Sequence, residues 1–388
     1  MRILWITLES ILPANTGGRI GVFKRLEQLS RENEIYLYYP YDNESELTQV
    51  KELEKYCKKV YPYNRTKNRK NGILRLFKYP FTVGSREFHD MKRDIQQCLD
   101  NYAIDVINVD FPHMCVNLFN INTDIPIVLN EHNIEWRVYR TIAKSHKNIF
   151  KKVAYFIDSY RLKSYEEKVL KKISFSKITF VSSEDMRSMI ESGMVSNEQA
   201  VLIPVGADVH EMENVPHDGL NIIFVGKMSY GPNIEAVSWF AKDIFPVIQE
   251  HLPKVKFFIV GKDPAEDVLK LKSPSIIITG IVDDLEKYYA IADLVVLPLR
   301  NGGGVKVKLL EAVGYKKPIV STSVGVEGTY YSNHIIPVSD DAEGFANLCL
   351  ECLCNFDKYN IEEAYKYFLD NYTWETVGDK YLNVLRNI

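Results

Sequence analysis

The chain has 388 residues, of which 46% are hydrophobic and 26% are charged, and its formal net charge is −3. This length favours two domains over one, and the nearly balanced charge argues against a general nucleic-acid-binding protein. The first residues lack a signal-peptide pattern, and no apolar run reaches the ~18 residues of a membrane span. We therefore expect a globular protein of the cytoplasm that does not bind nucleic acid.

The six cysteines form no spacing typical of a disulfide framework. Cys349, Cys352 and Cys354 have a metal-like spacing, but no second ligand cluster accompanies them and they fall in an apolar helical pattern. We expect these three cysteines to be small core residues of a helix.

Short apolar runs alternate with amphipathic stretches along the whole chain. In the first half, the runs that predict strands are residues 2–7, 34–39, 104–109, 125–130, 177–182 and 200–204. In the second half, they are residues 221–225, 256–260, 275–279, 294–297 and 318–321. The helical segments between them include residues 19–32, 234–251 and 285–292. This alternation predicts an α/β fold in which helices cover both faces of parallel sheets.

The strand–helix pattern restarts near Asn221, after a polar stretch that follows Asp208. We take this stretch as the hinge between two domains, 1–205 and 206–371. A last amphipathic helix is expected over 372–388, and the pattern alone does not assign it to either domain.

The segment that follows the predicted strand 294–297 carries the strongest ligand signal. Gly302, Gly303 and Gly304 lie directly before a predicted helix over 305–313. Glycines at such a point let a ligand approach backbone N–H groups, and the helix dipole favours an anion there. The segment therefore predicts a phosphate site.

Lys306 and Lys308 fall in the first turns of the same predicted helix. Cations are disfavoured at a helix N-terminus unless a negative group lies nearby, and a bound phosphate would provide one. The alternative is a plain glycine turn with two solvated lysines. Glu311 lies about 10 Å along the helix from Gly304, where its carboxylate could accept hydrogen bonds from sugar hydroxyls.

A second glycine turn follows the first predicted strand and contains Gly17, Gly18 and Arg19. It lacks the G-x-G-x-x-G spacing of a dinucleotide fingerprint, so a generic loop remains an alternative. Because ligands of open α/β sheets bind at the carboxyl ends of the strands, the turn is still a candidate anion site.

Three further residues follow predicted strands. His132, in the sequence NEHN, follows 125–130 and is either a catalytic or a structural histidine. Lys227 is a candidate anion contact at the start of the second half, and the GIVDD segment that contains Val282 could present backbone groups to a base. No Asp-x-Asp pair occurs, so we expect neither a metal nor another cofactor.

Two stretches are locally basic. Residues 65–78 contain six Lys or Arg and no acid, and residues 140–172 contain ten Lys or Arg against three acids, with aromatic residues interleaved. Such a stretch is either a solvated helix face or a contact with an anionic membrane surface.

In these motifs the chain resembles family 4 of the retaining glycosyltransferases, the subgroup with GGG before the basic helix. The matching blocks are TGGRI, EHNIEWR, FVGKMSYGPNIEAVSWF, GIVDDLEKYYAIADLVVLPL, GGGVKVKLLEAVGYKKPIVSTSVGVEG and TWETVGDKY. The resemblance implies the GT-B fold, with two Rossmann-like domains facing across a cleft and the last helix returning to the first domain. The first domain would take the acceptor and the second the nucleotide-sugar donor.

The resemblance also implies a role for each matching residue. Gly17 and Gly18 would lie over the donor diphosphate, and His132 would approach the donor sugar. Lys227 would contact phosphate, Val282 would meet the base through its backbone, and Glu311 would hold the ribose.

Two positions depart from the pattern that many members share. The first glutamate of their E-x7-E pair is replaced by Gly303, and a basic residue that is common a few positions after Lys227 is absent, with Asn233 in that neighbourhood. Lys306 and Lys308 could supply the missing positive charge.

We therefore expect a metal-independent, retaining glycosyltransferase that moves a sugar from a nucleotide-diphosphate donor to a glycan or a lipid-linked acceptor. The resemblance implies a role in making a cell-surface polysaccharide, with attachment to the inner face of the plasma membrane as the open alternative to a freely cytoplasmic protein. Two other functions stay open: a sugar-nucleotide epimerase of the same fold, and a catalytically silent partner subunit.

Overall fold

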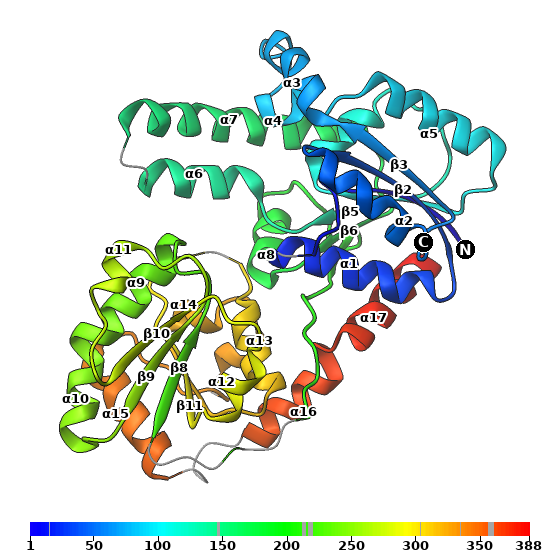
Figure 1. Ribbon diagram of the computed structural model, residues 1–388. Coiled ribbons are helices and arrows are strands. Elements are labelled where there is room, and N and C mark those ends of the chain that lie inside the picture. The colour runs from blue at the N-terminus through cyan, green and yellow to red at the C-terminus, as the bar shows by residue number, and fades with distance from the viewer. Residues whose placement is uncertain are drawn as a thin grey trace. The chain divides into compact units, whose positions relative to one another are not determined.

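The computed structural model describes residues 1–14, 16–145, 148–211, 215, 220–302, 304–333, 335–355 and 361–388. The chain forms two compact units (Figure 1). Unit 1 comprises Met1–Pro204 and Val377–Ile388, and unit 2 comprises Val205–Thr376. The predicted division after residue 205 lies one residue from the first boundary, whereas the chain returns to unit 1 at Val377, later than the predicted 372.

Unit 1 is built on a seven-stranded parallel sheet with the strand order β3-β2-β1-β4-β5-β6-β7. Its strands are β1 (Arg2–Ile6), β2 (Glu34–Tyr41), β3 (Lys59–Asn64), β4 (Val106–Asp110), β5 (Ile127–Glu131), β6 (Lys177–Phe180) and β7 (Ala200–Leu202). The central strands β1 and β4 are almost entirely buried, because helices cover both of their faces.

The helices of unit 1 form two cores, one on each face of this sheet. They are α1 (Gly17–Ser30), α2 (Val50–Leu53), α3 (Arg65–Leu74), α4 (Phe81–Gly84), α5 (His89–Asn101), α6 (Glu135–Ser145), α7 (Ile149–Lys172), α8 (Ser183–Glu191) and α17 (Trp374–Arg386), with 3₁₀ turns η1 (Glu44–Gln49) and η2 (Pro112–Asn117). Helices α1 and α17 bury apolar side chains on one face, and α5 and the second half of α7 do so on the other. Helices α6 and α7 extend side by side away from the sheet (Figure 1).

A buried polar network fixes α17 to the sheet of unit 1. The hydroxyl of Tyr381 lies 2.5 Å from Asn108 Oδ1 and 2.8 Å from Asn130 Oδ1. Thr179 donates to the same Asn130 oxygen at 2.7 Å, so three strands and the last helix share one set of hydrogen bonds. The sequence predicted the helix but not this anchor.

Unit 2 is built on a five-stranded parallel sheet with the order β10-β9-β8-β11-β12. Its strands are β8 (Asn221–Val225), β9 (Lys256–Val260), β10 (Ile276–Gly280), β11 (Leu294–Leu297) and β12 (Ile319–Ser321). Its helical elements are α9 (Gly231–Trp239), the π turn η3 (Phe240–Ile244), α10 (Phe245–His251), α11 (Glu266–Leu269), α12 (Glu286–Ala290), α13 (Val307–Gly314), α14 (Ser323–Val326), the 3₁₀ turn η4 (Tyr330–Asn333), α15 (Ala342–Cys354) and α16 (Ile361–Asn371). Helices α9, α10 and α15 cover one face, and α12, α13 and α16 cover the other. The strand order of the unit 2 sheet matches the first five strands of the unit 1 sheet, β3-β2-β1-β4-β5. This is the order of a Rossmann sheet.

The fold differs from the sequence prediction in three places. Strand β3 was not predicted, because it is an edge strand with half-buried residues and a central Pro62. The single helix predicted over 234–251 is interrupted by the π turn η3. Cys349 and Cys352 are buried core residues as expected, but Cys354 is exposed.

Within the described ranges, no group of His, Cys, Asp and Glu has the geometry to hold a metal ion. None of the helices described is both long enough and apolar enough to cross a bilayer.

Candidate functional site

In unit 2 the glycine segment between β11 and α13 forms a loop that Lys306 holds closed. Gly302 has φ +117° and Gly304 has φ +75°, backbone conformations that other residues rarely adopt. The ammonium of Lys306 donates to the carbonyl oxygens of Gly302 at 3.1 Å and Gly304 at 2.5 Å. Gly303 lies outside the described residues.

Lys306 lies one residue before the first helical turn that the sequence predicted for it, and it is not the solvated lysine of the alternative interpretation. Helix α13 begins at Val307, so Lys306 is its N-cap residue, and its side chain is buried. Its ammonium also lies 3.4 Å from a carboxylate oxygen of Glu327. Lys306 therefore shapes the loop with hydrogen bonds of its own, because its donors already have partners.

Lys308 lies in the first turn of α13, and its ammonium contacts only neutral groups among the described residues. It donates to Asn233 Oδ1 at 2.7 Å and lies 4.2 Å from the centroid of the Phe224 ring. Burial lowers the pKa of Lys308 to about 7, the charge of Glu311 acts against this shift, and Lys306 adds to it. An anion placed here would stabilise the charged form of Lys308.

Gly226, directly after β8, makes the position of Lys308 possible. A Cβ added at Gly226 would lie 2.8 Å from the ammonium of Lys308 and 2.7 Å from the amide nitrogen of Asn233. Asn233, which lies near the position of the missing basic residue, thus accepts the hydrogen bond that holds the ammonium of Lys308.

Glu311 lies one turn further along α13, on a half-buried surface. Its carboxylate accepts no hydrogen bond from the residues that the structure describes. Burial raises the pKa of Glu311 to about 7, with Lys308 opposing the shift and Asp208 adding to it. A hydroxyl donor from a ligand would satisfy this carboxylate.

The two other candidates of unit 2 lie in loops that follow the strands β8 and β10, at the carboxyl edge of the sheet. Lys227 follows β8, is exposed, and lies 3.7 Å from a carboxylate oxygen of Asp263. Val282 follows β10 and is half-buried, and its main chain makes no hydrogen bond within the described part of the chain. The carboxyl ends of β8, β10 and β11 therefore bring together Lys227, Val282, Lys308 and Glu311 at one edge of the sheet.

In unit 1, Gly17 and Gly18 are the first residues of α1, which Thr16 caps. Both are exposed, and a Cβ added to either would meet nothing within 4 Å. The chain itself therefore gives no steric reason for glycine at these two positions.

Arg19, in the same turn, is already engaged. Its guanidinium donates to Glu9 at 2.8 Å and to Glu46 at 2.9 Å. Two ion pairs through Nη2 hold this side chain against the loop after β1, and the role of Arg19 toward a donor stays a prediction.

His132 follows β5 and stacks on Phe111, with ring centroids 4.5 Å apart and planes 12° from parallel. Its Nε2 lies 3.4 Å from Asp110 Oδ1. Phe111 has φ +65°, a strained conformation for an aromatic residue. The residue whose ring stacks on His132 is therefore held in a strained backbone conformation at the end of β4.

Asp110, which the sequence analysis missed, organises this edge of unit 1. It accepts hydrogen bonds from Trp5 Nε1 at 2.9 Å and Asn130 Nδ2 at 2.8 Å, and Arg25 lies 3.9 Å away. Burial alone would raise the pKa of Asp110, but the contacts with His132, Arg25 and Trp5 lower it overall. The signal that could have found it is an aspartate at the end of an apolar strand.

Glu131, the neighbour of His132, is buried, and neither of its carboxylate oxygens has a hydrogen-bond partner in the described structure. Burial raises the pKa of Glu131 well above its ordinary value, and the nearby Glu166 adds to the shift. Burial likewise raises the pKa of Glu166 to about 8.

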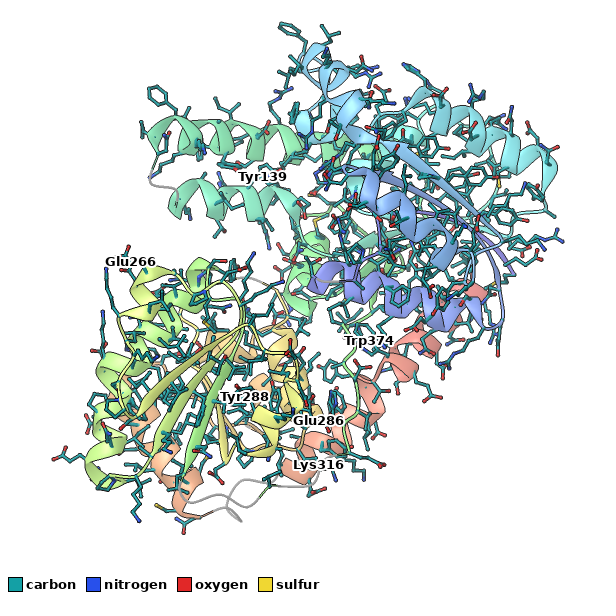
Figure 2. All side chains as sticks on the ribbon, in the orientation of Figure 1. Tyr139, Glu266, Glu286, Tyr288, Lys316 and Trp374 are labelled. Carbon is teal, nitrogen blue, oxygen red and sulfur yellow. The ribbon has the colours of Figure 1, made fainter. Side chains whose placement is uncertain are left out.

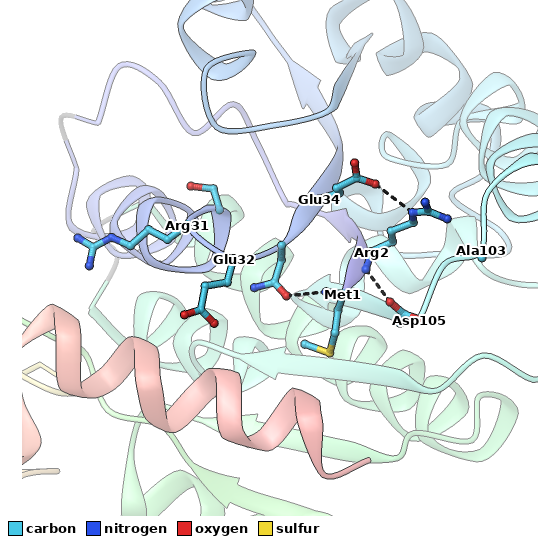
Figure 3. A pocket seen from close by; sticks show the side chains of 9 residues that line it. Met1, Arg2, Arg31, Glu32, Glu34, Ala103 and Asp105 are labelled. Carbon is cyan, nitrogen blue, oxygen red and sulfur yellow. Dashed lines mark hydrogen bonds and ion pairs between the residues drawn. The ribbon is translucent and has the colours of Figure 1, made fainter.

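A shallow depression of about 580 Å³ lies at the opposite edge of the unit 1 sheet (Figure 3). Arg2 bridges two of its acidic residues: Arg2 Nε donates to Glu34 at 2.9 Å, and the Arg2 main-chain N–H donates to Asp105 at 2.7 Å. Because ligands of open α/β sheets bind at the carboxyl ends of the strands, this depression is a poor candidate site.

Comparison with known proteins places these features in context. Residues 219–355 match the family described as "Glycosyl transferases group 1". An uncharacterized 44.6 kDa protein in the cps region of Klebsiella pneumoniae is 27% identical over 391 residues, which cover 93% of this chain and 97% of that protein.

Two solved structures align along the whole chain. Sucrose-phosphate synthase from Thermosynechococcus elongatus aligns with a TM-score of 0.65 at 14% identity, covering 100% of this chain and 98% of that one. The Anabaena protein HepE, solved in complex with UDP, aligns with a TM-score of 0.66 at 14% identity, covering 100% of each chain. The chain has the GT-B fold, and residues 219–355 match the group 1 glycosyl transferases.

Proposed function

We propose that the protein is a glycosyltransferase that binds a nucleoside-diphosphate sugar at the carboxyl edge of the unit 2 sheet. One observation carries the proposal: Lys308 is a largely desolvated cation that contacts only neutral groups, beside a carboxylate, Glu311, that accepts no hydrogen bond. A diphosphate beside Lys308 and a ribose beside Glu311 would satisfy both groups at once.

The comparisons support this proposal. The match to the group 1 glycosyl transferases spans the whole of this edge, from β8 to α15. The Anabaena protein HepE has also been solved in complex with UDP-glucose. The Klebsiella relative lies in a cps region, which supports polysaccharide biosynthesis as the role.

The chemistry follows from these groups. Lys308, Lys227 and backbone N–H groups would stabilise the departing diphosphate, so the transfer would need no metal ion. We further propose that the transfer retains the configuration at the anomeric carbon of the sugar. The proposed acceptor is a glycan or a lipid-linked molecule. An epimerase would instead need acid and base carboxylates flanking the sugar, and a silent subunit would bind the donor without turnover.

The test is calorimetry of the full chain with UDP, GDP, dTDP and ADP, with and without EDTA. Lys308→Met should weaken binding about 10- to 100-fold, because it removes a charge-assisted contact. Lys287→Met, at an exposed lysine of α12, is the matched control and should bind like the parent. Binding that is unchanged in Lys308→Met would refute the assignment, and binding that needs Mg²⁺ would refute metal independence.

Incubation with the donor sugars separates the three functions. A transferase slowly releases free sugar from the donor it recognises. Production of an isomeric donor would identify an epimerase, and binding without either product would identify a silent subunit.

We also propose that unit 1 attaches to an anionic membrane through the first half of α7 and the end of α3. Phe150, Val153 and Ile157 lie on one exposed stripe of α7, on the side opposite to its buried Leu162 and Val169. The large side chain of Phe77 after α3 is fully exposed. Arg161 on α7 donates to the Tyr79 carbonyl at 2.6 Å, which links the two segments.

Basic residues surround these exposed apolar side chains. Lys151 and Lys152 flank the stripe and are exposed, and Lys67, Arg69 and Lys70 are exposed on α3. Apolar insertion together with about 1 kcal/mol of attraction per basic residue would bind an anionic surface.

Flotation with vesicles tests this attachment. The protein should float with mixed phosphatidylcholine–phosphatidylglycerol vesicles, should not float with phosphatidylcholine alone, and should be released by salt. Phe150→Ser combined with Phe77→Ser should abolish flotation, whereas Leu269→Ser, at an exposed leucine of α11, should not. Equal flotation with both kinds of vesicle would refute the proposal.

A further inference from the structure

Arg86, in the loop between α4 and α5, is a buried arginine whose position is fixed from several sides. Its side chain is only 9% exposed. The amide of the fully buried Asn117 donates to the Arg86 carbonyl at 2.8 Å, and Asn68 donates to the Ser85 carbonyl at 3.0 Å. The loop is therefore ordered before any ligand arrives.

The guanidinium of Arg86 contacts backbone oxygens and no carboxylate. Its Nε donates to the Leu8 carbonyl at 3.3 Å and its Nη1 to the Thr82 carbonyl at 2.9 Å. Among the residues described, no carboxylate lies within 4.0 Å of it. Other arginines of unit 1 that lie near this edge do have such a partner: Arg19, Arg25, Arg65 and Arg75.

The nearest carboxylates already belong to other cations. Asp42 and Glu9 are close enough to act on Arg86 electrostatically. However, Asp42 pairs with Arg65 through two hydrogen bonds, and Glu9 pairs with Arg19 at 2.8 Å. Burial lowers the pKa of Arg86 to about 10, with Arg65 adding to the shift, so the guanidinium still carries its charge at pH 7.

Glu135 on α6 is the remaining acid near Arg86, and it does not act as the counter-ion. Burial raises the pKa of Glu135 to about 7 although Arg86 acts in the opposite direction. No carboxylate oxygen of Glu135 lies within 4.0 Å of the Arg86 guanidinium, so the two side chains do not form an ion pair. Tyr139 lies one turn further along α6 (Figure 2), and the charge of Arg86 acts to lower the pKa of its hydroxyl, which burial raises.

All these groups lie at the carboxyl edge of the unit 1 sheet. Leu8 follows β1, Asp42 follows β2, and Glu135 lies on the helix after β5. This is the edge at which a Rossmann-type sheet binds its ligand, and a buried charge without a counter-ion is costly unless a ligand supplies one.

We propose that Arg86 binds an anionic group, a phosphate or a carboxylate, carried by the acceptor that receives the sugar. This inference rests on the proposed glycosyltransferase function and narrows its acceptor to a negatively charged molecule. The planar guanidinium suits bidentate contact with either anion, and the Tyr139 hydroxyl adds a second donor.

The test is calorimetry of the full chain saturated with the nucleoside diphosphate that it binds best. The three probes are octyl glucoside, octyl glucuronide and octyl phosphate, which share a chain and differ in charge. We expect at least one anionic probe to bind about tenfold more tightly than octyl glucoside. A preference for octyl phosphate indicates a phosphorylated acceptor, and a preference for octyl glucuronide indicates an acidic sugar.

Variants of Arg86 decide whether this residue is responsible. Arg86→Met should remove the preference for the anionic probe, and Arg86→Lys should keep part of it. Tyr139→Phe should lower it several-fold without touching the bonds that Arg86 makes to the backbone. Arg187→Met, at an exposed arginine of α8, is the matched control.

Two results would overturn the inference: equal binding of neutral and anionic probes by the parent, or an unchanged preference in folded Arg86→Met or in Tyr139→Phe. A repeat of the titrations without nucleotide keeps the two proposals apart. If no nucleoside diphosphate binds, the proposed function fails, while the probes still report on Arg86.

Discussion

Lys308 lies at the carboxyl edge of the unit 2 sheet, and several arginines lie at the carboxyl edge of the similarly ordered unit 1 sheet. The two sets of cations differ in whether a carboxylate contacts them. Lys308 contacts an amide oxygen and an aromatic ring, and its pKa is lowered to about 7. In unit 1, Arg19 and Arg65 each contact a carboxylate, and among the buried arginines of this edge Arg86 lacks one in the described structure.

This difference is the observation behind the two proposed anion sites. A desolvated cation without a counter-ion costs several kcal/mol, so its persistence points to a ligand that supplies the charge. In unit 2 the lysine without an ion pair, Lys308, lies beside a glycine loop and near the carboxylate of Glu311, and we propose that this set of groups suits a nucleoside diphosphate. In unit 1 the cation without a carboxylate partner is the single residue Arg86, which suits a smaller anionic group.

The largest expected effect separates chemistry in unit 1 from nucleotide binding in unit 2. If His132 approaches the donor sugar, as the resemblance implies, His132→Ala should lower turnover about 100-fold or more, because it removes a group that Asp110 and Phe111 hold in place. The affinity for the bare nucleoside diphosphate should stay within about twofold of the parent, because Lys308 and Glu311 are unchanged. Steady-state kinetics alongside calorimetry measures both quantities.

Asp110→Asn is the companion variant, because it keeps the shape of the residue that supports His132. It should lower turnover in the same direction and leave nucleotide affinity unchanged. A parallel loss of nucleotide affinity in either variant would contradict the division of roles between the two edges.

A pH dependence of stability should distinguish the two units next. The pKa of Glu166 is raised to about 8 in the folded protein, above its ordinary value of 4.5. Unfolding therefore releases a proton between pH 4.5 and 8, so the free energy of unfolding falls as pH rises through this window. Glu166→Gln should restore on the order of 2–4 kcal/mol to unit 1 at pH 8 and change little at pH 4.5.

Hydrogen exchange of peptides from each unit is the measurement, because two units need not unfold together. Protection of β5 and α7 should increase in Glu166→Gln at pH 8, whereas peptides of unit 2 should be unaffected. Glu191→Gln, at an exposed residue of α8, provides the control. An unchanged pH profile in Glu166→Gln would show that this carboxyl is ionised in the folded protein.

The sequence predicted the buried strands of both sheets and the place of Lys308. It did not predict which side chains contact the cations at the carboxyl edges. Buried strands such as β1 and β8 are apolar runs, so they were found, whereas the half-exposed β3 was not. The place of Lys308 was also predicted from the glycines before its helix. Its neutral surroundings were not, because Asn233 lies 75 residues away in sequence.

The lack of a carboxylate partner at Arg86 was even less predictable from the sequence. Nothing near it in sequence distinguishes it from Arg75, which contacts Glu87 at 3.1 Å. Its isolation arises because other arginines occupy Asp42 and Glu9, from loops after three different strands. Pairings of this kind depend on how the loops assemble and leave no periodic signal in the chain.

The smallest expected effect concerns two glycines that a sequence motif treats alike. Gly302 has φ +117°, so Gly302→Ala should lower the stability of unit 2 by about 1–2 kcal/mol through backbone strain. Gly17 has no positive φ and nothing within 4 Å of an added Cβ. Since alanine also favours helix over glycine, Gly17→Ala should leave unit 1 as stable as before or more stable by up to about 1 kcal/mol.

The informative result is what Gly17→Ala does to activity. If the donor diphosphate lies over this turn, the added methyl group should lower kcat/KM several-fold even though the protein is no less stable. Kinetics and hydrogen exchange on the same preparation compare the two effects. A Gly17→Ala variant with the parent's kcat/KM would remove Gly17 from the donor site, and glycine at this helix start would then have no explanation in substrate binding.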